Sequence, residues 1–247
     1  MNAVTRRTCI AMGGLSAGLV AFGARETGIL SKPAQAPLQP AASARDLLQQ
    51  RHLPNVALVT HDGRRVRFYD DLVKDKKVVL TFVSSRARAD TDKVMKNLAT
   101  IQRLFGGRVG TDLFLYSIAR TPERDARGTL NAWAVWNGAG PGWKFLTGAP
   151  SDVETLRQGL GFTSEDAAED ADPRYSVGLV RYGSEPEMRW GHCQSQADAR
   201  VLAHSLLLDF GTGPASADSP ITRAFGTGAD PANAPVWNCR LLRTSAA

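Results

Sequence analysis

The segment Lys77–Phe105 constrains the fold more than any other part of the chain. It opens with a mostly apolar run of strand length, Val78–Val83, which is rich in β-branched residues and predicts a buried β-strand. From Val94 onward the apolar residues recur at helical spacing, which predicts an amphipathic helix. A strand–loop–helix junction is where α/β folds usually place their chemistry. Here the connecting loop, Ser84–Asp90, contains neither Cys nor His.

Strand and helix signals alternate along the rest of the chain. Two short alternating runs, at 56–60 and 64–68, flank Asp62-Gly63 and predict a β-hairpin. The elements expected after Phe105 are a strand at 112–118, a helix from Thr121 to Trp136, a strand at 143–147, a helix at 151–160, a hairpin of 176–182 and 187–190, and a helix at 196–210. This order predicts an α/β protein with a thioredoxin-like fold: a mixed central sheet flanked by helices, with an N-terminal β-hairpin.

Composition and charge narrow the functional classes. The 247 residues are 43% hydrophobic and 22% charged, enough for one sizeable core with tails. The formal net charge is +6, but basic residues alternate with acidic ones and no aromatic–basic platform is present. We therefore expect no nucleic-acid partner. The chain also lacks a Gly-rich phosphate loop, a nucleophile elbow and an HExxH motif, so it does not match those enzyme classes.

Residues 1–36 have the layout of an export signal. Thr5-Arg6-Arg7 precedes a mildly apolar run rich in Gly and Ala, and Ala34-Gln35-Ala36 is a small-x-small cleavage site. The paired arginines favour a Tat-like (twin-arginine) route, with the general secretory (Sec) route as the alternative. A further alternative is an uncleaved N-terminal anchor, which would be the protein's membrane contact. We expect a periplasmic or secreted protein.

Composition also sets the expected domain boundaries. Residues 37–52 are rich in Ala, Pro, Gln and Ser near their start and are expected to form a linker. The folded domain is expected over 53–210. Residues 211–247 are rich in Gly, Ala, Pro and Ser and are expected to form a low-complexity C-terminal tail.

Two cysteines lie outside the signal, Cys193 and Cys239. An even number of cysteines in an exported chain permits a disulfide, and two buried thiols are the alternative. His192 precedes Cys193 directly. His192, Cys193 and Cys239 together are a candidate metal site, because thiolate and imidazole are ligands for soft and borderline metal ions.

Four stretches resemble the SCO/SenC family, exported thioredoxin-fold copper chaperones of cytochrome c oxidase assembly. LPNVALVTHDGRRVRFYDDLV, at 53–73, is similar to the family's opening, and KVVLTFVSS, at 77–85, to its central strand. DLFLYSIARTPERD, at 112–125, resembles F-x-S-I-x-x-D-P-E-R-D, and PGWKFLTG, at 141–148, resembles P-G-W-x-F-L-T-G. The resemblance covers about 53–210. It implies a role in copper handling or oxidase maturation, with a respiratory oxidase subunit or a copper-handling protein as partner.

The family's copper ligands have no equivalents in this chain. The resemblance places the two cysteines of the family's C-x-x-x-C-P motif at Ala87 and Thr91, and its histidine at Tyr175. None of these residues suits Cu(I). The resemblance thus predicts a degenerate active site, with copper implied by the family alone. The alternative is a copper carrier whose ligands are relocated to His192, Cys193 and Cys239, since thiolate and imidazole both bind copper. With no catalytic thiol in the loop, we expect neither thiol redox chemistry nor enzymatic activity.

The same loop carries two arginines, Arg86 and Arg88, close to the start of the predicted helix. One interpretation is that they hold an anion or a partner's carboxylate beside the helix N-terminus. The other interpretation, which the sequence favours, is a loop of solvated charges in which Asp90 caps the helix.

Overall fold

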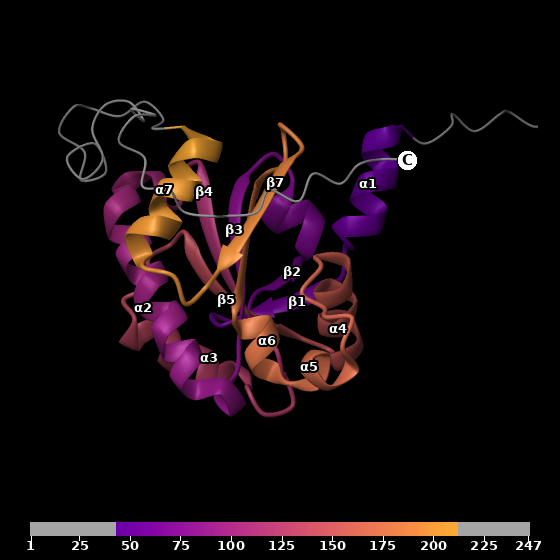
Figure 1. Cartoon of the computed structure of the whole chain (residues 1–247), viewed down its shortest axis with the longest axis vertical. Coiled ribbons are helices and arrows are strands. Elements are labelled where there is room, and N and C mark those ends of the chain that lie inside the picture. Colours follow the sequence, from indigo (N-terminus) through magenta and orange to yellow (C-terminus); the bar gives the residue numbers. More distant parts are fainter. Residues whose placement is uncertain (1–42, 212–247) are drawn as a thin grey trace, which may run out of the picture. The chain divides into compact units, whose positions relative to one another are not determined.

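Strand β3 (Lys77–Val83) lies at the centre of a mixed sheet, as its apolar run predicts. The computed structural model describes residues 43–211, and within this range the sheet has seven strands in the order β2-β1-β5-β4-β3-β6-β7 (Figure 1). The other strands are β1 (Ala57–Thr60), β2 (Arg65–Arg67), β4 (Leu113–Ala119), β5 (Trp143–Gly148), β6 (Leu179–Ser184) and β7 (Arg189–Gln194). Every residue of β3 after Lys77 is buried, which is typical of a strand covered on both faces.

Strands β3, β4 and β5 are parallel, and the other neighbours pair antiparallel. Leu80 of β3 pairs with Tyr116 of parallel β4 and with Arg181 of antiparallel β6. Parallel neighbours need a crossover, and α2 (Arg88–Phe105) supplies it between β3 and β4. Tight turns close the two hairpins, and Gly63 in the first has φ +90°, which favours glycine. The thioredoxin-like α/β fold predicted from the sequence is confirmed.

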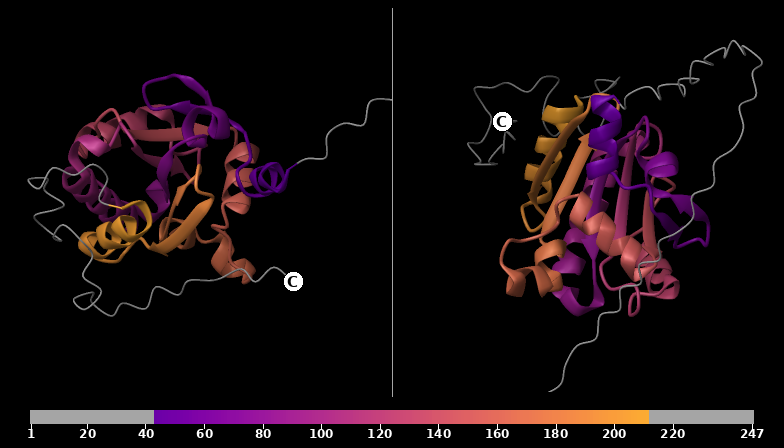
Figure 2. Two further views of the ribbon diagram at one scale, coloured as in Figure 1. Left: turned by 90° about the horizontal axis from the view of Figure 1, so that it is seen from above. Right: turned by 90° about the vertical axis from the view of Figure 1, so that its right-hand side faces the viewer.

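Helices cover both faces of the sheet (Figure 2). Besides α2, the helical elements are α1 (Ala44–His52), η1 (Phe68–Val73), η2 (Ser85–Ala87), η3 (Gly106–Arg108), α3 (Arg127–Trp136), α4 (Pro150–Gly159), α5 (Ala167–Ala171), α6 (Pro173–Val177) and α7 (Ala199–Phe210). Helices α2, α3 and α7 pack against the face that carries Val79 and Val83. Helix α4 and η1 pack against the face of Leu80 and Phe82. The complete burial of Leu98 on α2 alone stabilises the fold by about 2 kcal/mol.

Part of the predicted linker is helical. Residues 37–52 were expected to connect the signal to the domain, yet α1 occupies the end of this range. Ser43 Oγ accepts a hydrogen bond from the Asp46 backbone N–H, and the Asp46 carboxylate accepts one from the Ser43 N–H, which is a capping box. Arg45 Nη2 lies 2.7 Å from Oε1 of the buried Glu185. The ordered domain therefore begins before residue 53.

The helix expected from Thr121 begins six residues later, at Arg127. Thr121 Oγ1 donates to Asp125 Oδ2 at 2.7 Å, and Asp125 also accepts from the loop after β3. These contacts hold 121–125 in a turn, although a Pro at 122 would suit the first turn of a helix.

The strand expected from Ser176 begins at Leu179. The preceding residues form α6, because Asp172 accepts a hydrogen bond from the Arg174 N–H as the helix N-cap and Pro173 occupies the first helical position. The short α6 packs against β3 and α2, which brings Tyr175 to the end of the sheet where the parallel strands finish (Figure 1).

Several predictions concern residues outside the described range. They include the export signal at 1–36, nearly all of the tail at 211–247, and Cys239 within that tail. Over residues 43–211, no helix has both the length and the apolar character needed to cross a membrane. The predictions for the two ends of the chain stay predictions.

Candidate functional site

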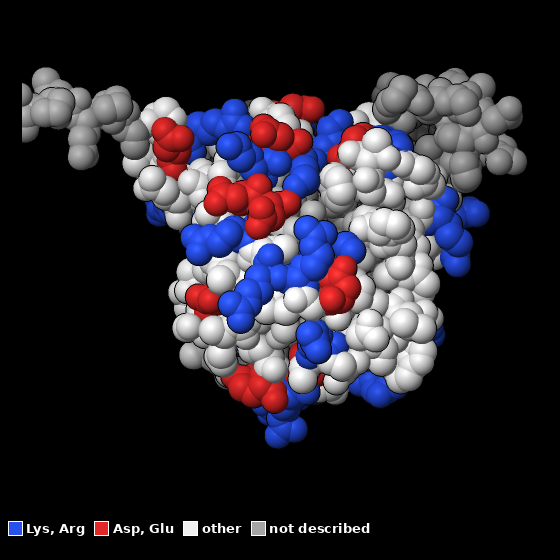
Figure 3. Space-filling view, turned by 180° about the vertical axis from the view of Figure 1, so that it is seen from behind, with Lys and Arg blue, Asp and Glu red and all other residues white. Residues whose placement is uncertain are grey.

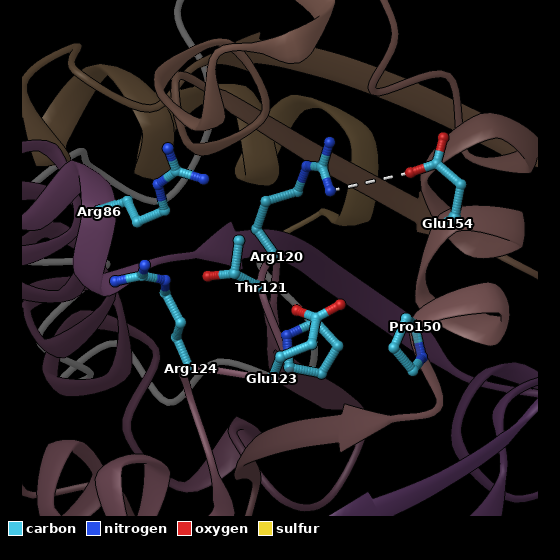
Figure 4. A pocket seen from close by; sticks show the side chains of 8 residues that line it. Arg86, Arg120, Thr121, Glu123, Arg124, Pro150 and Glu154 are labelled. Carbon is cyan, nitrogen blue, oxygen red and sulfur yellow. Dashed lines mark ion pairs between the residues drawn. The ribbon is translucent and has the colours of Figure 1, made fainter.

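The loops that follow the three parallel strands meet around a cleft of about 510 Å³ (Figure 4). Arg86 comes from the turn after β3, Arg120 follows β4 directly, and Pro150 opens α4 after β5. The full lining is Arg86, Arg120, Thr121, Pro122, Glu123, Arg124, Pro150 and Glu154. Open α/β sheets bind ligands at the carboxyl ends of their strands, so the position of this cleft makes it the leading candidate site.

Hydrogen bonds fix the loop after β3 to the loop after β4. The Ser84 N–H donates to Thr91 Oγ1 at 3.0 Å, and the Thr91 hydroxyl donates to the Ser84 carbonyl at 2.9 Å. Ser84 Oγ lies 3.0 Å from Thr121 Oγ1. Because the Thr121 proton goes to Asp125, the Ser84 hydroxyl is the donor in this pair. Asp125 is fully buried and also accepts from the Ser85 N–H at 3.2 Å.

The structure brings the elements that carry Ala87, Thr91 and Tyr175 together. These residues lie on η2, α2 and α6, which pack against one another. Ala87 is 4% exposed and offers no donor atom, while the hydroxyl of the buried Thr91 bonds to the Ser84 backbone. Tyr175 Oη donates to the Thr163 carbonyl at 3.2 Å. Among the described residues, no group of three or more His, Cys, Asp or Glu side chains could hold a metal ion.

His192 and Cys193 do not converge on one point. They are successive residues of β7, and successive side chains of a strand project to opposite faces. Cys193 is 5% exposed and belongs to the core on the face of α2 and α7. His192 pairs with Arg181 of β6, and burial, with a smaller contribution from Arg181, lowers the pKa of its imidazole. Since Cys239 lies outside the described range, the disulfide and the alternative copper site stay predictions.

Three guanidinium groups line the cleft, and none of them donates a hydrogen bond to any residue of the described range. Arg86 and Arg124 are exposed on one side of Thr121, whereas Arg120 extends the other way toward Glu154 (Figure 4). The Arg120 side chain is 18% exposed, and its Nη1 stays 3.8 Å from Glu154 Oε2. Burial, and then the neighbouring Arg157, lower the pKa of Arg120.

The helix behind the cleft is held by a second charged cluster. The buried Arg157 donates to both carboxylate oxygens of Glu154, at 2.7 and 2.9 Å, and to both of Asp170, at 2.5 and 2.7 Å. Hydrogen bonds from Arg157 lower the pKa of the Glu154 carboxyl group and lower that of Asp170 to about 2. Glu154 is therefore ionised at neutral pH and already engaged by Arg157.

The N-terminus of α2 lies earlier in the chain than the sequence predicted, and its cap is a different residue. Ala87 is the N-cap residue, so Asp90 lies in the first helical turn and does not cap the helix. Arg88 pairs with Asp92 at 3.7 Å on the exposed helix surface and does not line the cleft. Of the two predicted arginines, only Arg86 belongs to the site.

Charge on the face drawn in Figure 3 does not point to another site. On the face shown in Figure 3, basic and acidic side chains alternate without a large area of one sign. The candidate site therefore rests on the geometry of the cleft and not on a charged surface.

Comparison with known proteins identifies the fold. No protein-family model matches the chain, and no curated protein matches it in sequence. Among solved structures, yeast Sco1 superposes with a TM-score of 0.50 at 14% identity, covering 66% of this chain and 99% of the solved Sco1 chain. The chain has the fold of Sco1. The resemblance predicted from the four motifs is thus confirmed at the level of the fold.

Two other solved structures have similar TM-scores, identities and coverages. Copper-bound ScoI from Arabidopsis thaliana has a TM-score of 0.49 at 18% identity and covers 62% of this chain and 94% of its own. A SCO1/SenC family lipoprotein from Bacillus anthracis has a TM-score of 0.47 at 14% identity and covers 61% of this chain and 90% of its own.

Sequence reasoning missed Arg120 and the Arg157 cluster. Arg120 lies inside the motif at 112–125, but nothing local shows that it borders a cleft. Glu154 and Arg157 are three residues apart on a helix, a spacing that predicts their contact. The contact of Arg157 with Asp170, by contrast, depends on how the segment after α4 folds back.

Proposed function

We propose that this chain is an exported SCO/SenC-like protein with an accessory or binding role in copper handling and cytochrome c oxidase maturation. Its partner in this role is a respiratory oxidase subunit or a copper-handling protein. The loop after β3 holds no copper through the positions Ala87, Thr91 and Tyr175. The four sequence motifs and the shared fold with Sco1 support the family relationship.

The observation that carries the proposal is the hydrogen-bonded closure of the loop after β3. Thr91 uses its hydroxyl as both donor and acceptor for the Ser84 backbone, and Asp125 accepts from Thr121 and Ser85. A metal ion bound at Thr91 would have to break two of these bonds in a buried environment, which is costly. This arrangement suits a fixed scaffold more than a metal-binding loop.

Copper titration of the mature protein tests the proposal. The protein is titrated with Cu(I) in the presence of a competing chelator, in parallel with a Cys193→Ser/Cys239→Ser variant. We expect no stoichiometric Cu(I) binding by either protein. Stoichiometric binding that survives both substitutions would contradict the proposal, whereas binding that the substitutions abolish would support relocated ligands at His192, Cys193 and Cys239.

Export is a separate part of the proposal and has its own measurement. Cleavage after Ala36 predicts a mature protein that begins at Pro37 and is recovered from the periplasm. Mass spectrometry of the purified protein identifies its first residue. A Lys-Lys substitution of Arg6 and Arg7 separates the two routes, because it blocks twin-arginine export while general secretion tolerates it.

A further inference from the structure

We propose that the cleft between Arg86, Arg120 and Arg124 binds a carboxylate group. The proposal goes beyond copper handling and does not depend on it. It rests on three guanidinium groups that line one cleft from two loops and make no hydrogen bond within the described range (Figure 4). A carboxylate is the group whose two oxygens match the fork of an arginine.

Arg120 is the strongest single indication of a missing partner. Its side chain is 18% exposed, and its Nε is buried without a hydrogen-bond partner in the described part of the chain. At 3.8 Å, the nearest oxygen of Glu154 is too distant for a normal hydrogen bond. Buried donors are rarely left unsatisfied, and Arg120 borders the cleft with a guanidinium group that no acceptor of the described residues satisfies, which suits an acceptor from outside.

The two exposed arginines lie on backbone that is already fixed. The Arg86 N–H donates to Ser84 Oγ at 3.2 Å, and the Arg124 N–H donates to the Thr121 carbonyl at 2.9 Å. Since Ser84 and Thr121 bond to each other, the hydrogen bonds that close the loop after β3 also set the spacing of the two arginines. Preorganised backbone reduces the entropy lost when a ligand binds.

The charges around the cleft favour an anionic group that carries one negative charge, whatever molecule that group belongs to. Arg120 and Arg157 are balanced by Glu154 and Asp170, which contact them. The charged lining residues that remain are Arg86, Arg124 and Glu123, whose formal charges sum to a single positive charge. A carboxylate neutralises this charge, whereas a phosphate dianion would exceed it and approach Glu123 and Glu154.

The carboxylate has two possible sources, a small organic acid or an acidic segment of a protein. A volume of about 510 Å³ falls within the usual range for small-molecule sites and also admits one or two acidic side chains of a peptide. The chemistry of recognition is the same in both cases. The experiment therefore uses a probe of each kind.

The test titrates metal-free mature protein with succinate, with a tetraglutamate peptide and with inorganic phosphate, and follows backbone amide chemical shifts. We expect saturable shifts around Arg86, Arg120 and Arg124 with at least one carboxylate probe. The Arg86→Gln/Arg124→Gln variant should weaken this binding about tenfold or more. The matched control, Arg88→Gln/Arg103→Gln, removes the same charge from exposed positions of α2 outside the cleft and should change affinity less than about twofold.

Each outcome decides the proposal. Binding of succinate, of the peptide or of both supports it, and the comparison identifies the source of the carboxylate. The proposal is overturned if neither carboxylate gives saturable shifts, if the two double variants weaken binding equally, or if phosphate binds more tightly than both carboxylates. Because no copper is present in this experiment, its failure leaves the proposed function in place.

Discussion

Thr121 Oγ1 donates a hydrogen bond of 2.7 Å to Asp125 Oδ2, and this contact sets the shape of the loop after β4. Asp125 also accepts from the Ser85 N–H, so one buried carboxylate joins the loops after β3 and β4. Arg86 and Arg124 both lie on the backbone that this carboxylate stabilises. The contact explains both the hydrogen-bonded closure of the loop and the arrangement of the cleft.

Asp125→Ala is expected to destabilise the protein by about 1–3 kcal/mol, because it leaves the Ser85 N–H and the Thr121 hydroxyl without their acceptor. Urea denaturation measures the change in the free energy of unfolding. Asp152→Ala, a substitution in the first turn of α4, is a control expected to cost less than about 1 kcal/mol. Equal losses in the two variants would show that the Asp125 contacts contribute no special stability.

Restoring the ligand types at the family's positions should create a copper site. The variant Ala87→Cys/Thr91→Cys/Tyr175→His is made on a Cys193→Ser/Cys239→Ser background and titrated with Cu(I). Since η2, α2 and α6 pack together, we expect stoichiometric binding. The control variant Ala87→Cys/Tyr175→His, which keeps Thr91, should bind Cu(I) at least about tenfold more weakly. A folded triple variant that binds no copper would show that the positions assigned from the resemblance are wrong.

The Arg157–Asp170 pair should contribute stability that disappears in acid. The pKa of Asp170 is lowered from its usual value near 3.8 to about 2 by hydrogen bonds from Arg157. A lowered carboxyl pKa in the folded state adds stability above pH ~4, and this contribution is lost as the pH falls toward about 2. Asp170→Asn should therefore cost on the order of 1 kcal/mol at pH 7 and almost nothing at pH 2. Denaturant titrations at the two pH values measure the difference, and a pH-independent cost would refute this account.

Arg45 is expected to hold α1 on the domain. Its guanidinium is 2.7 Å from Glu185, whose side chain is 1% exposed and also accepts from Tyr69 Oη and the Asp75 N–H, both at 2.9 Å. Arg45→Ala removes only the contact of the half-exposed partner, so the global stability should fall little. Amide exchange across 44–52 should accelerate several-fold, because local opening becomes easier.

The control for this experiment is Arg51→Ala, an exposed residue of the same helix. Exchange across α1 should change little in that variant. If Arg45→Ala leaves exchange unchanged as well, the helix is held by other contacts, such as the packing of the buried Leu53 at its C-terminal end.

Local patterns in the sequence determined the central strand β3 and the helix α2 that follows it. The apolar run of β3 and the helical period of α2 are short-range signals, and both elements are present, although α2 begins at Arg88, inside the segment predicted as a loop. Gly106 ends α2 with φ +52°, a conformation that favours glycine. The motifs at 112–125 and 141–148 correctly indicated a fold shared with Sco1. Periodicity and special backbone angles depend on neighbouring residues, which is why the sequence alone suffices for them.

Only the tertiary structure decided which charged residues meet. Arg45 contacts Glu185, which lies 140 positions further along the chain. Local composition carries no sign of this contact, and for that reason it predicted a linker where α1 forms. Ser84 Oγ bonds to Thr121 across 37 positions and the Ser85 N–H bonds to Asp125 across 40. These contacts accompany the Thr121–Asp125 hydrogen bond in a turn where local signals favoured a helix. The cleft likewise exists because three parallel strands end side by side and bring Arg86 next to Arg120 and Arg124. Hydrogen bonds and ion pairs between distant segments leave no periodic trace in the sequence, so chain folding alone determines them.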